Sequence, residues 1–333
     1  MKKSLKQMLL VVLVLAFAFF GASCKKNDKI QIGILQPVEH DALDLARKGF
    51  VDALAEKGYK DGENIAITYA NANGQESDLV TLSKSLTSKS DLTLGIGTGA
   101  TVALQSAQVN SGSKKPIIFT AVTDAVTAGL VASNEKPGGF ITGTSDANPV
   151  AAQISLIKEC LPEADKIGIL YTQSEINSEV QANQAEAQAT SEGLSVVRMT
   201  CTDTTDLAQV AENLCKTEGL DALYIPTDNL IAANMATVKA AVERYHILCV
   251  TGEESIMASG GHVTLSIDYY ELGKKAGYMA ASVLKGEAKC ESTAVQTMSI
   301  SECKYLMCTE NITAAGITIP DSVKEKCTDV KAK

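Results

Sequence analysis

The chain has 333 residues, of which 45% are apolar, and its formal net charge is −9. A chain of this length and composition can fill more than one hydrophobic core, so two domains are expected. Lys and Arg form no cluster after Lys29, and an acidic chain without a basic run is not expected to bind nucleic acid. Tryptophan is absent, so any aromatic contact to a ligand would come from Tyr or Phe.

The first residues are typical of an export signal. Lysines within the first six residues precede an apolar run, Met8–Phe20, and small residues follow it up to Cys24. The run is shorter than the roughly 20 residues that a membrane-spanning helix needs, and no second run of that kind follows. We therefore expect residues 1–23 to be a cleaved signal peptide. The mature protein is expected at the extracytoplasmic face of the cell membrane or in the periplasm.

Cys24 stands where the lipobox of bacterial lipoproteins has its lipidated cysteine. The resemblance predicts a lipid anchor, such as palmitate, on Cys24 and a polar tether over residues 24–29. The segment departs from the usual pattern at Gly21, where leucine is common, and at Ser23, where glycine or alanine is common. A cleaved signal followed by an ordinary thiol is the alternative interpretation.

The other cysteines all lie beyond residue 159. An exported protein can form disulfides, and Cys303, Cys308 and Cys327 are the bridge candidates. Cys249 lies in an apolar run and is expected in the core. No cysteines combine close spacing with nearby histidines, so no metal site is predicted.

From Lys29 onward, short apolar runs alternate with amphipathic segments of helical length, which is the pattern of parallel sheets covered by helices. In chain order, the first unit has predicted strands at 30–35, 65–70, 92–96, 116–120 and 142–146, with helices at 41–57, 75–88 and 101–108. The pattern then restarts, with strands at 166–171, 195–199, 222–225, 247–251 and 263–266 and helices at 149–161, 175–191, 206–216 and 231–244. A last helix at 269–284 contains Gly273, Gly277 and Ala280, which leave room for close contact. Only short strand-like pieces are expected in residues 295–320.

This order predicts an α/β fold with two Rossmann-like lobes, each built on a parallel sheet. Residues 30–145 with about 266–290 would form the first lobe, and residues 146–265 with about 291–322 the second. Residues 323–333 would be a tail. The chain would cross between the lobes near residues 145, 266 and 291, and the cleft between the lobes is the natural ligand site.

Polar residues follow many of the predicted strands, where loops and helix N-termini of a parallel α/β sheet converge on ligands. Their hydroxyls, amides, carboxylates and phenols are the groups that hydrogen-bond a zwitterion. The candidates are Glu39, His40, Thr98, Gly99, Ala100, Thr120, Thr123, Asp124, Tyr171, Glu175, Asn177, Ser178, Asp228, Asn229, Glu254, Asp268 and Tyr269.

Several of these candidates have a second interpretation. Asp228, Glu254 and Asp268 are also suited to cap the helices that follow them, and His40 is suited either to a ligand contact or to a cap. The stretch Gly95–Gly99 resembles a dinucleotide motif only weakly, because no acidic strand end follows at the required distance. A helix N-terminus that holds a carboxylate, or glycines of a tight turn, are the other interpretations.

No serine or cysteine combines with a histidine in a nucleophilic pattern, so we expect no enzyme and no cofactor. An exported hydrolase would need such a constellation. A ligand-sensing regulator or receptor component that binds a nucleoside or a sugar would share the fold. It would need a DNA-binding segment or a second transmembrane helix, and the sequence predicts neither.

Many short blocks in the same order resemble the tryptophan/tyrosine-type ABC transporter substrate-binding proteins. The blocks are Glu39-His40, Gly97-Thr98, Phe119–Asp124, Gly129–Val131, Thr142–Asp146, Glu175–Ser178, Pro226–Asn229 and Asp268–Gly273. The resemblance implies a type I periplasmic-binding fold with three crossovers, a monomer that closes on an aromatic amino acid and serves the permease and ATPase subunits of an importer.

By analogy with amino-acid binders of this fold, the resemblance also assigns roles. Thr98 with Thr120 or Thr123 would hold the ligand carboxylate. Asp228 or Glu254 would pair with the ligand ammonium group, and Tyr171 and Tyr269 would contact its ring. Ala125 departs from the proline that relatives have there, so the fold is better predicted than the ligand.

Overall fold

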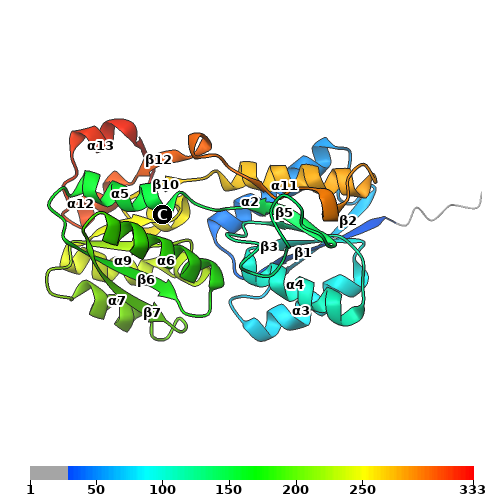
Figure 1. Cartoon of the computed structure of the whole chain (residues 1–333), viewed down its shortest axis with the longest axis horizontal. Coiled ribbons are helices and arrows are strands. Elements are labelled where there is room, and N and C mark those ends of the chain that lie inside the picture. Colours follow the sequence, from blue (N-terminus) through cyan, green and yellow to red (C-terminus); the bar gives the residue numbers. More distant parts are fainter. Residues whose placement is uncertain (1–28) are drawn as a thin grey trace, which may run out of the picture.

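The computed structural model describes residues 29–333, and the chain folds into two α/β lobes that lie side by side (Figure 1). The predicted signal peptide, Cys24 and all of the predicted tether except Lys29 lie outside the described residues. Within the described residues, no helix is both long and apolar enough to cross a membrane.

The first lobe is built on a six-stranded sheet of parallel strands, in the order β11-β5-β4-β3-β1-β2. Its strands are β1 (Ile30–Gln36), β2 (Ile65–Asn71), β3 (Leu92–Ile96), β4 (Ile117–Thr120), β5 (Ile141–Ser145) and β11 (Gln296–Thr297). Its helices are α2 (Asp41–Glu56), α3 (Glu76–Lys89), α4 (Thr98–Ser111) and α11 (Tyr269–Leu284), with the 3-10 turn η1 (Cys290–Ser292).

The second lobe has a seven-stranded sheet in the order β13-β12-β10-β9-β8-β6-β7. Its strands are β6 (Lys166–Thr172), β7 (Ser195–Cys201), β8 (Ala222–Ile225), β9 (Leu248–Thr251), β10 (Val263–Ser266), β12 (Lys304–Met307) and β13 (Thr328–Asp329). Its helices are α5 (Val150–Cys160), α6 (Ile176–Ser191), α7 (Leu207–Cys215), α8 (Asn229–Ala233), α9 (Met235–Tyr245), α10 (Glu254–Gly260), α12 (Thr309–Ala314) and α13 (Asp321–Lys326). Only β12 pairs antiparallel to its neighbour β10 among the strands of this sheet.

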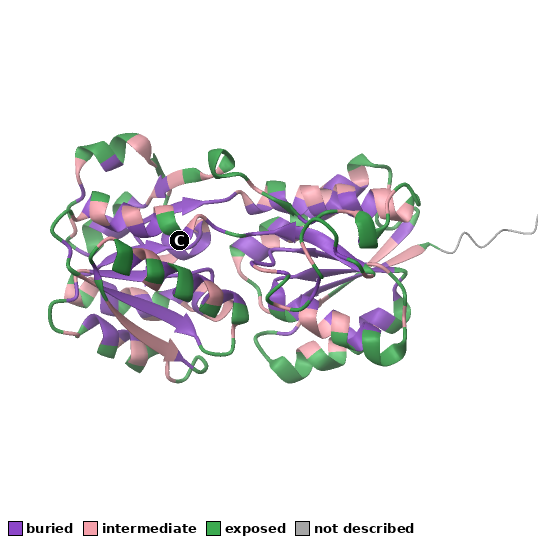
Figure 2. Ribbon diagram, viewed as in Figure 1, coloured by how far each residue is buried: buried purple, intermediate pink, exposed green. Residues whose placement is uncertain are grey.

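Helices cover both faces of each sheet, which explains why the strands are continuous apolar runs in the sequence. In the first lobe, Ile32 and Ile34 of β1 pack toward α2 and α11, whereas Leu35 packs toward α3 and α4. Figure 2 shows the strands as mostly buried and the outer faces of the helices as mostly exposed. The predicted two-lobed α/β architecture is therefore confirmed.

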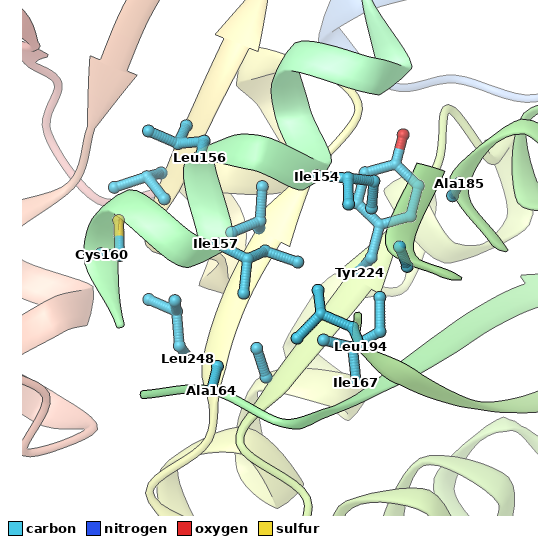
Figure 3. Packing of buried hydrophobic residues seen from close by; sticks show 14 of the residues in the cluster. Ile154, Leu156, Ile157, Cys160, Ala164, Ile167, Ala185, Leu194, Tyr224 and Leu248 are labelled. Carbon is cyan, nitrogen blue, oxygen red and sulfur yellow. The ribbon is translucent and has the colours of Figure 1, made fainter. Parts of the chain in front are cut away.

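In the second lobe, α5 packs against β9 and β10, and its side chains share a core with residues of β6 and β8 (Figure 3). Ile154 and Ile157 of α5 share this core with Ile167 and Tyr224. The phenol of Tyr224 is completely buried and donates to Oε1 of Gln153 at 2.7 Å, so its polar atom is satisfied inside the core.

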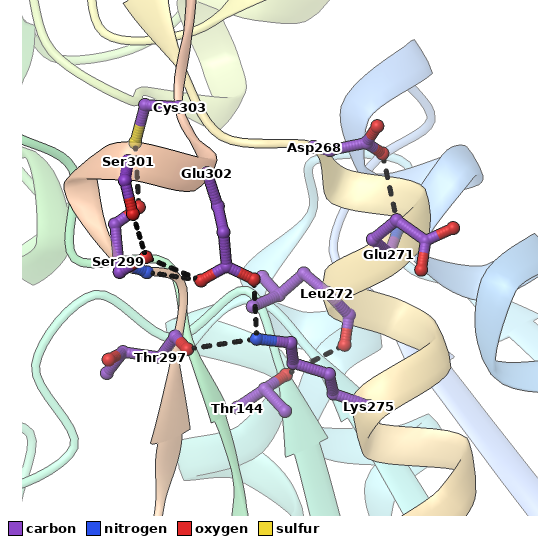
Figure 4. A network of polar contacts seen from close by, with 10 residues as sticks. All are labelled: Thr144, Asp268, Glu271, Leu272, Lys275, Thr297, Ser299, Ser301, Glu302 and Cys303. Carbon is purple, nitrogen blue, oxygen red and sulfur yellow. Dashed lines mark hydrogen bonds and ion pairs between the residues drawn. The ribbon is translucent and has the colours of Figure 1, made fainter.

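The chain passes between the lobes three times: after β5, after β10 and after β11. The third passage comes later than residue 291, because Gln296 and Thr297 still pair with β5 of the first sheet. Figure 4 shows how this passage is held to α11: Lys275 Nζ reaches the carbonyl of Thr297 at 3.3 Å and a carboxylate oxygen of Glu302 at 3.2 Å. Ser299 and Glu302 form a capping box on the turn η2 (Ile300–Glu302).

Three local predictions need correction. The helix expected over 231–244 is interrupted at Asn234, which separates α8 from α9. The region 295–320 contains a helix, α12, in addition to short strands. Residues 323–333 are not a free tail, because β13 pairs with β12 and Val323 of α13 is 1% exposed in the core of the second lobe.

Helices α2 and α11 touch through glycines. A Cβ on Gly273 would lie 2.0 Å from the carbonyl oxygen of Ala46, and one on Gly49 would lie 2.0 Å from that of Tyr270. We expect Gly273→Ala to lower the stability of the protein by about 2 kcal/mol, because overpacking outweighs the better helix propensity of alanine. Thermal unfolding would measure the loss. Gly139→Ala is the control, since a Cβ there meets nothing within 4 Å, and equal effects of the two changes would contradict the prediction.

Candidate functional site

The strand ends of the two lobes enclose a small polar cavity of about 20 Å³. A cavity of this size holds about one water molecule. Of the described residues that line it, three are acidic and none is Lys or Arg, so the cavity favours a cationic group. The lining residues are His40, Leu43, Ala121, Thr123, Asp146, Asn177, Thr227, Asp228, Asn229, Glu253 and Tyr269.

Asp146 lies just past the end of β5, at the first passage between the lobes. It accepts a hydrogen bond from the hydroxyl of Thr123 at 3.0 Å and one from the phenol of Tyr269 at 2.9 Å. Burial raises the pKa of the Asp146 carboxyl, although both hydrogen bonds favour its charged form. Each carboxylate oxygen has further lone pairs, so Asp146 can accept an additional donor from the cavity.

Ala121 precedes Thr123 at the end of β4 and has a backbone φ of 56°. This left-handed conformation is unfavourable for a residue with a side chain, and such residues cluster at functional sites. The turn keeps Thr123 within reach of Asp146.

Gln181 connects the second lobe to this group. The side chain lies on α6 and is completely buried. Its amide nitrogen donates to the hydroxyl of Thr227 and, at 3.4 Å, to that of Thr123 in the first lobe, while its oxygen accepts from the backbone N–H of Thr227 at 3.3 Å. A hydrogen-bond chain therefore runs from Thr227 through Gln181 and Thr123 to Asp146.

His40 makes a second contact between the lobes, with Asn229. The ring Nε2 lies 3.2 Å from Oδ1 of Asn229. The amide nitrogen of Asn229 donates to Glu175 at 2.5 Å, so its oxygen faces His40 and Nε2 is the donor. The other ring nitrogen, Nδ1, is buried without a hydrogen-bond partner. It remains available for a group inside the cavity.

Asp228 connects two elements of the second lobe, β6 and α8. Its Oδ1 accepts from the hydroxyl of Thr172 at 2.8 Å and from the backbone N–H of Ile231 at 2.9 Å, and its Oδ2 accepts from the backbone N–H of Thr172 at 2.6 Å. Asp228 is thus the N-cap of α8, and burial raises the pKa of its carboxyl. The side chain both borders the cavity and holds β6 to α8.

A larger cavity of about 510 Å³ also lies between the lobes and shares Asn177 and Asn229 with the small one. The first lobe contributes residues of α3 and α4, and the second contributes the start of α6 and residues of α8. At the N-terminus of α4, the hydroxyl of Thr98 is buried without a hydrogen-bond partner, and Thr98 and Gly99 line this cavity. Free N–H groups and the helix dipole at such an end favour an anion.

Comparison with known proteins identifies the family. The model of the ABC transporter substrate binding protein family matches residues 31–331. The chain belongs to this family. A protein of Clostridioides difficile described as a tyrosine-binding protein is 40% identical over 79% of this chain and 76% of its own length.

Two solved structures of similar proteins cover 91% of this chain and all of their own, each at 36% identity. One is an ABC domain from Streptococcus pneumoniae in complex with L-Trp, with a TM-score of 0.84. The other is the ligand-free, open structure of a substrate binding protein with adhesive properties from Clostridium difficile, with a TM-score of 0.67. These likenesses confirm the predicted family and its fold.

Membership also confirms that the chain is a substrate-binding protein rather than an enzyme. Substrate-binding proteins of ABC transporters are extracytoplasmic, in agreement with the predicted location. Between residues 29 and 333, no group of three or more His, Cys, Asp and Glu side chains is arranged to hold a metal ion.

The substrate-binding protein brings several predicted site residues together. His40, Thr123, Asn177, Asp228, Asn229 and Tyr269 line the small cavity, and Thr98, Gly99, Glu175, Asn177 and Asn229 line the large one. The sequence interpretation missed Asp146, Gln181, Thr227 and Glu253. Thr227 and Glu253 follow predicted strands and Asp146 ends one, so the search for polar residues at strand ends could have included them, but a glutamine within a helix carries no such signal.

Other predicted site residues line neither cavity. Thr120 is buried and accepts from Thr144, and Asp124 accepts from the backbone of its own loop. The hydroxyl of Tyr171 accepts a hydrogen bond from Arg198 of β7 at 2.6 Å. Asp268 caps α11 and pairs with Lys304.

Glu39, Ala100, Ser178 and Glu254 are also outside the two cavities. Ser178 donates to the carbonyl of Thr227. Glu254 begins α10, whereas the preceding residue, Glu253, borders the small cavity and caps that helix. Adjacent residues at a helix start point in different directions, so a shift of one residue changes which carboxylate faces the cleft.

Glu175 should make the stability of the protein depend on pH. Burial and the nearby Asp228 carboxyl raise the pKa of Glu175 to about 7 from an ordinary value of 4.5. The folded protein thus binds this proton more tightly than the unfolded chain, so the stability it contributes is complete below pH 4.5 and is lost as the pH rises through 7.

We expect this group to lower the free energy of unfolding by roughly 1–3 kcal/mol between about pH 4.5 and pH 8. Glu175→Gln should remove that part of the decline, as measured by urea unfolding across this pH range. The exposed Glu39 offers a control, and Glu39→Gln should leave the slope unchanged. Equal slopes in the wild type and Glu175→Gln would contradict the prediction.

Proposed function

We propose that this substrate-binding protein captures an aromatic amino acid between its lobes and delivers it to the permease of an ABC importer. The tyrosine-binding relative and the L-Trp complex described above support the ligand class. The observation that carries the proposal is the small polar cavity, where three carboxyl groups and an unpaired histidine nitrogen meet between the lobes.

The charges at the site suggest how a zwitterion would bind. Its ammonium group would enter the small cavity and pair with Asp146, which accepts only two hydrogen bonds, whereas Asp228 and Glu253 each accept three. Its carboxylate would lie toward Thr98 at the N-terminus of α4, on the other side of Asn229. A buried charge needs such a partner, since an unpaired one costs several kcal/mol.

The ring of the ligand would extend into the larger cavity, which has apolar walls from Leu79, Val102, Ile176 and Leu230. Among residues 29–333, no Tyr or Phe lines that cavity, so the proposed ring contacts are mainly aliphatic. Tyr269 acts through its hydroxyl on Asp146 and its ring at the small cavity, and Tyr171 is not part of the proposed site.

Hinge closure would complete the site, because its residues come from both lobes. The likeness to the L-Trp complex exceeds the likeness to the open, ligand-free structure at the same 36% identity. That difference supports a closed arrangement of the lobes here. The contacts of His40 with Asn229 and of Gln181 with Thr123 would hold this closed form.

Calorimetric titration of residues 25–333 with L-tryptophan, L-tyrosine and L-phenylalanine tests the ligand class. At least one should bind with micromolar affinity or better, and small-angle X-ray scattering should show a smaller radius of gyration on binding. Binding of only sugars or nucleosides would overturn the ligand class. Scattering profiles that do not change with a bound ligand would overturn hinge closure.

We further propose that Cys24 is lipidated and anchors the monomeric protein to the membrane beside its permease and ATPase partners. The small residues before Cys24 and the polar residues after it support the anchor. Cys24→Ser should release the protein from the membrane fraction and abolish incorporation of labelled palmitate. Retention of Cys24→Ser in that fraction would contradict the anchor.

A further inference from the structure

Two free cysteines, Cys160 and Cys327, pack against the same hydrophobic core, on the side of the second lobe where the end of the chain packs. Helix α5 ends at Cys160, and Cys327 directly follows α13. Cys160 is 2% exposed within the core that lies under α5, and Cys327 is half-buried and packs against the same core. Figure 3 shows the sulfur of Cys160 at the end of α5, within this cluster.

The residues next to the two cysteines are already in contact. Glu159 and Lys326 each precede a cysteine by one position, and they form an ion pair. The backbone N–H of Cys327 donates to the carbonyl of Val323 at 3.2 Å, one helical turn earlier. Val323 is buried in the core that contains Cys160, and residues four apart lie on the same side of a helical turn. The side chain of Cys327 therefore faces the core that contains Cys160.

The geometry points to a disulfide between Cys160 and Cys327 that fastens the C-terminal segment to α5 in the mature protein. The extracytoplasmic compartment permits such a bond. The cysteines expected from the sequence to pair are separated instead: Cys303 packs against the core of the first lobe, and Cys308 lies in a small cluster with Met257. Of the other cysteines in residues 29–333, Cys160 alone lies in the cluster that contains Cys327.

The oxidant would be a disulfide, either in the active site of a dithiol oxidoreductase or in a small molecule such as oxidised glutathione. The more exposed Cys327 attacks first as a thiolate and forms a mixed disulfide, which releases one thiol of the oxidant. The thiolate of Cys160 then attacks the sulfur of Cys327 and releases the second thiol. Two protons leave the protein thiols, and their two electrons reduce the oxidant.

Both thiols are poor nucleophiles at neutral pH. Burial and the neighbouring Cys327 thiol raise the pKa of Cys160 to about 12, and burial raises the pKa of Cys327 as well. Only a small fraction of each is thiolate, so the reaction should be slow and should accelerate as the pH rises.

Peptide mapping of the full chain gives a direct test. The purified protein is incubated with oxidised glutathione, alkylated, digested with trypsin and analysed without reduction. Cleavage after Lys158, Lys166, Lys326 and Lys331 yields the peptides 159–166 and 327–331. We expect them joined, two hydrogens lighter than their sum, and separate after reduction. Recovery of both as alkylated thiols, or of either joined to another cysteine, would overturn the proposal.

Two variants keep the test independent of a folding defect. Cys327→Ser, at a half-buried position, should abolish the joined peptides and leave peptide 159–166 alkylated. Cys303→Ser removes another partly buried cysteine and should leave the joined peptides unchanged. Oxidation should raise the Tm of the wild type by several degrees and leave that of Cys327→Ser unchanged. A joined pair that survives in Cys327→Ser, or an equal rise in Tm in both, would contradict the assignment.

Discussion

Asp146→Asn should weaken binding of the proposed aromatic amino acid by about 100-fold or more. The change keeps the shape of the side chain and leaves it able to hydrogen-bond the hydroxyls of Thr123 and Tyr269, which can rotate. It removes the negative charge that would pair with the ligand ammonium group in the small cavity. The fold should therefore persist, and calorimetric titration with L-tryptophan and L-tyrosine would measure the loss.

Ligand analogues separate this role from a general weakening of the site. Tryptamine keeps the ammonium group and lacks the carboxylate, whereas indole-3-propionate keeps the carboxylate and lacks the ammonium group. Asp146→Asn should weaken binding of tryptamine and leave binding of indole-3-propionate equal or stronger. Glu254→Gln is the matched control, because Glu254 lies outside both cavities, and its affinity should stay within about threefold of the wild type. Full affinity in Asp146→Asn would exclude Asp146 as the partner.

Asp228→Ala should destabilise the second lobe by about 3 kcal/mol. The change removes the cap of α8 and leaves two backbone N–H groups, those of Thr172 and Ile231, without their acceptor. Asp228 is only 2% exposed, so bulk water has little access to these N–H groups. Thermal and urea unfolding would measure the loss, and a variant as stable as the wild type would contradict the prediction.

Asn at this position should not restore the stability. Its Oδ1 can replace the oxygen that bonds the hydroxyl of Thr172 and the N–H of Ile231, but its amide nitrogen would face the N–H of Thr172, so two donors would meet. Asp124 provides the contrast. It also accepts three hydrogen bonds within its loop, yet it is only partly buried, and water can replace the carboxylate. Asp124→Ala should therefore cost only about 1 kcal/mol.

The locations of the strands and most helices could be predicted because their signals are local. A run such as Leu92–Ile96 is apolar throughout since helices cover both faces of its sheet, and α11 begins and ends where its pattern predicts. Gly273 was recognised as a contact point, and a Cβ there would collide with Ala46. Features with weak sequence patterns were not predicted. Helix α10 is only seven residues long, and the break at Asn234 has no Gly or Pro to mark it.

The site was predicted only in part. Polar residues at strand ends indicate which region of the sheet binds a ligand, but not the direction in which each side chain points. This criterion found Asp228 and Asn229, but it named Glu254 where Glu253 borders the cavity, and Thr120 where the side chain turns into the core. Gln181 could not be found at all, since its partners Thr123 and Thr227 are more than 40 positions away in the sequence.

The sequence alone determined that this protein has two α/β lobes and belongs among the substrate-binding proteins of ABC transporters, because periodicity and ordered motifs depend on near neighbours along the chain. The tertiary structure decided which polar groups face one another across the cleft. It also decided which cysteines share a core and where the chain last passes between the lobes. These pairings depend on how two separate sheets come together in space, and no local pattern records that arrangement.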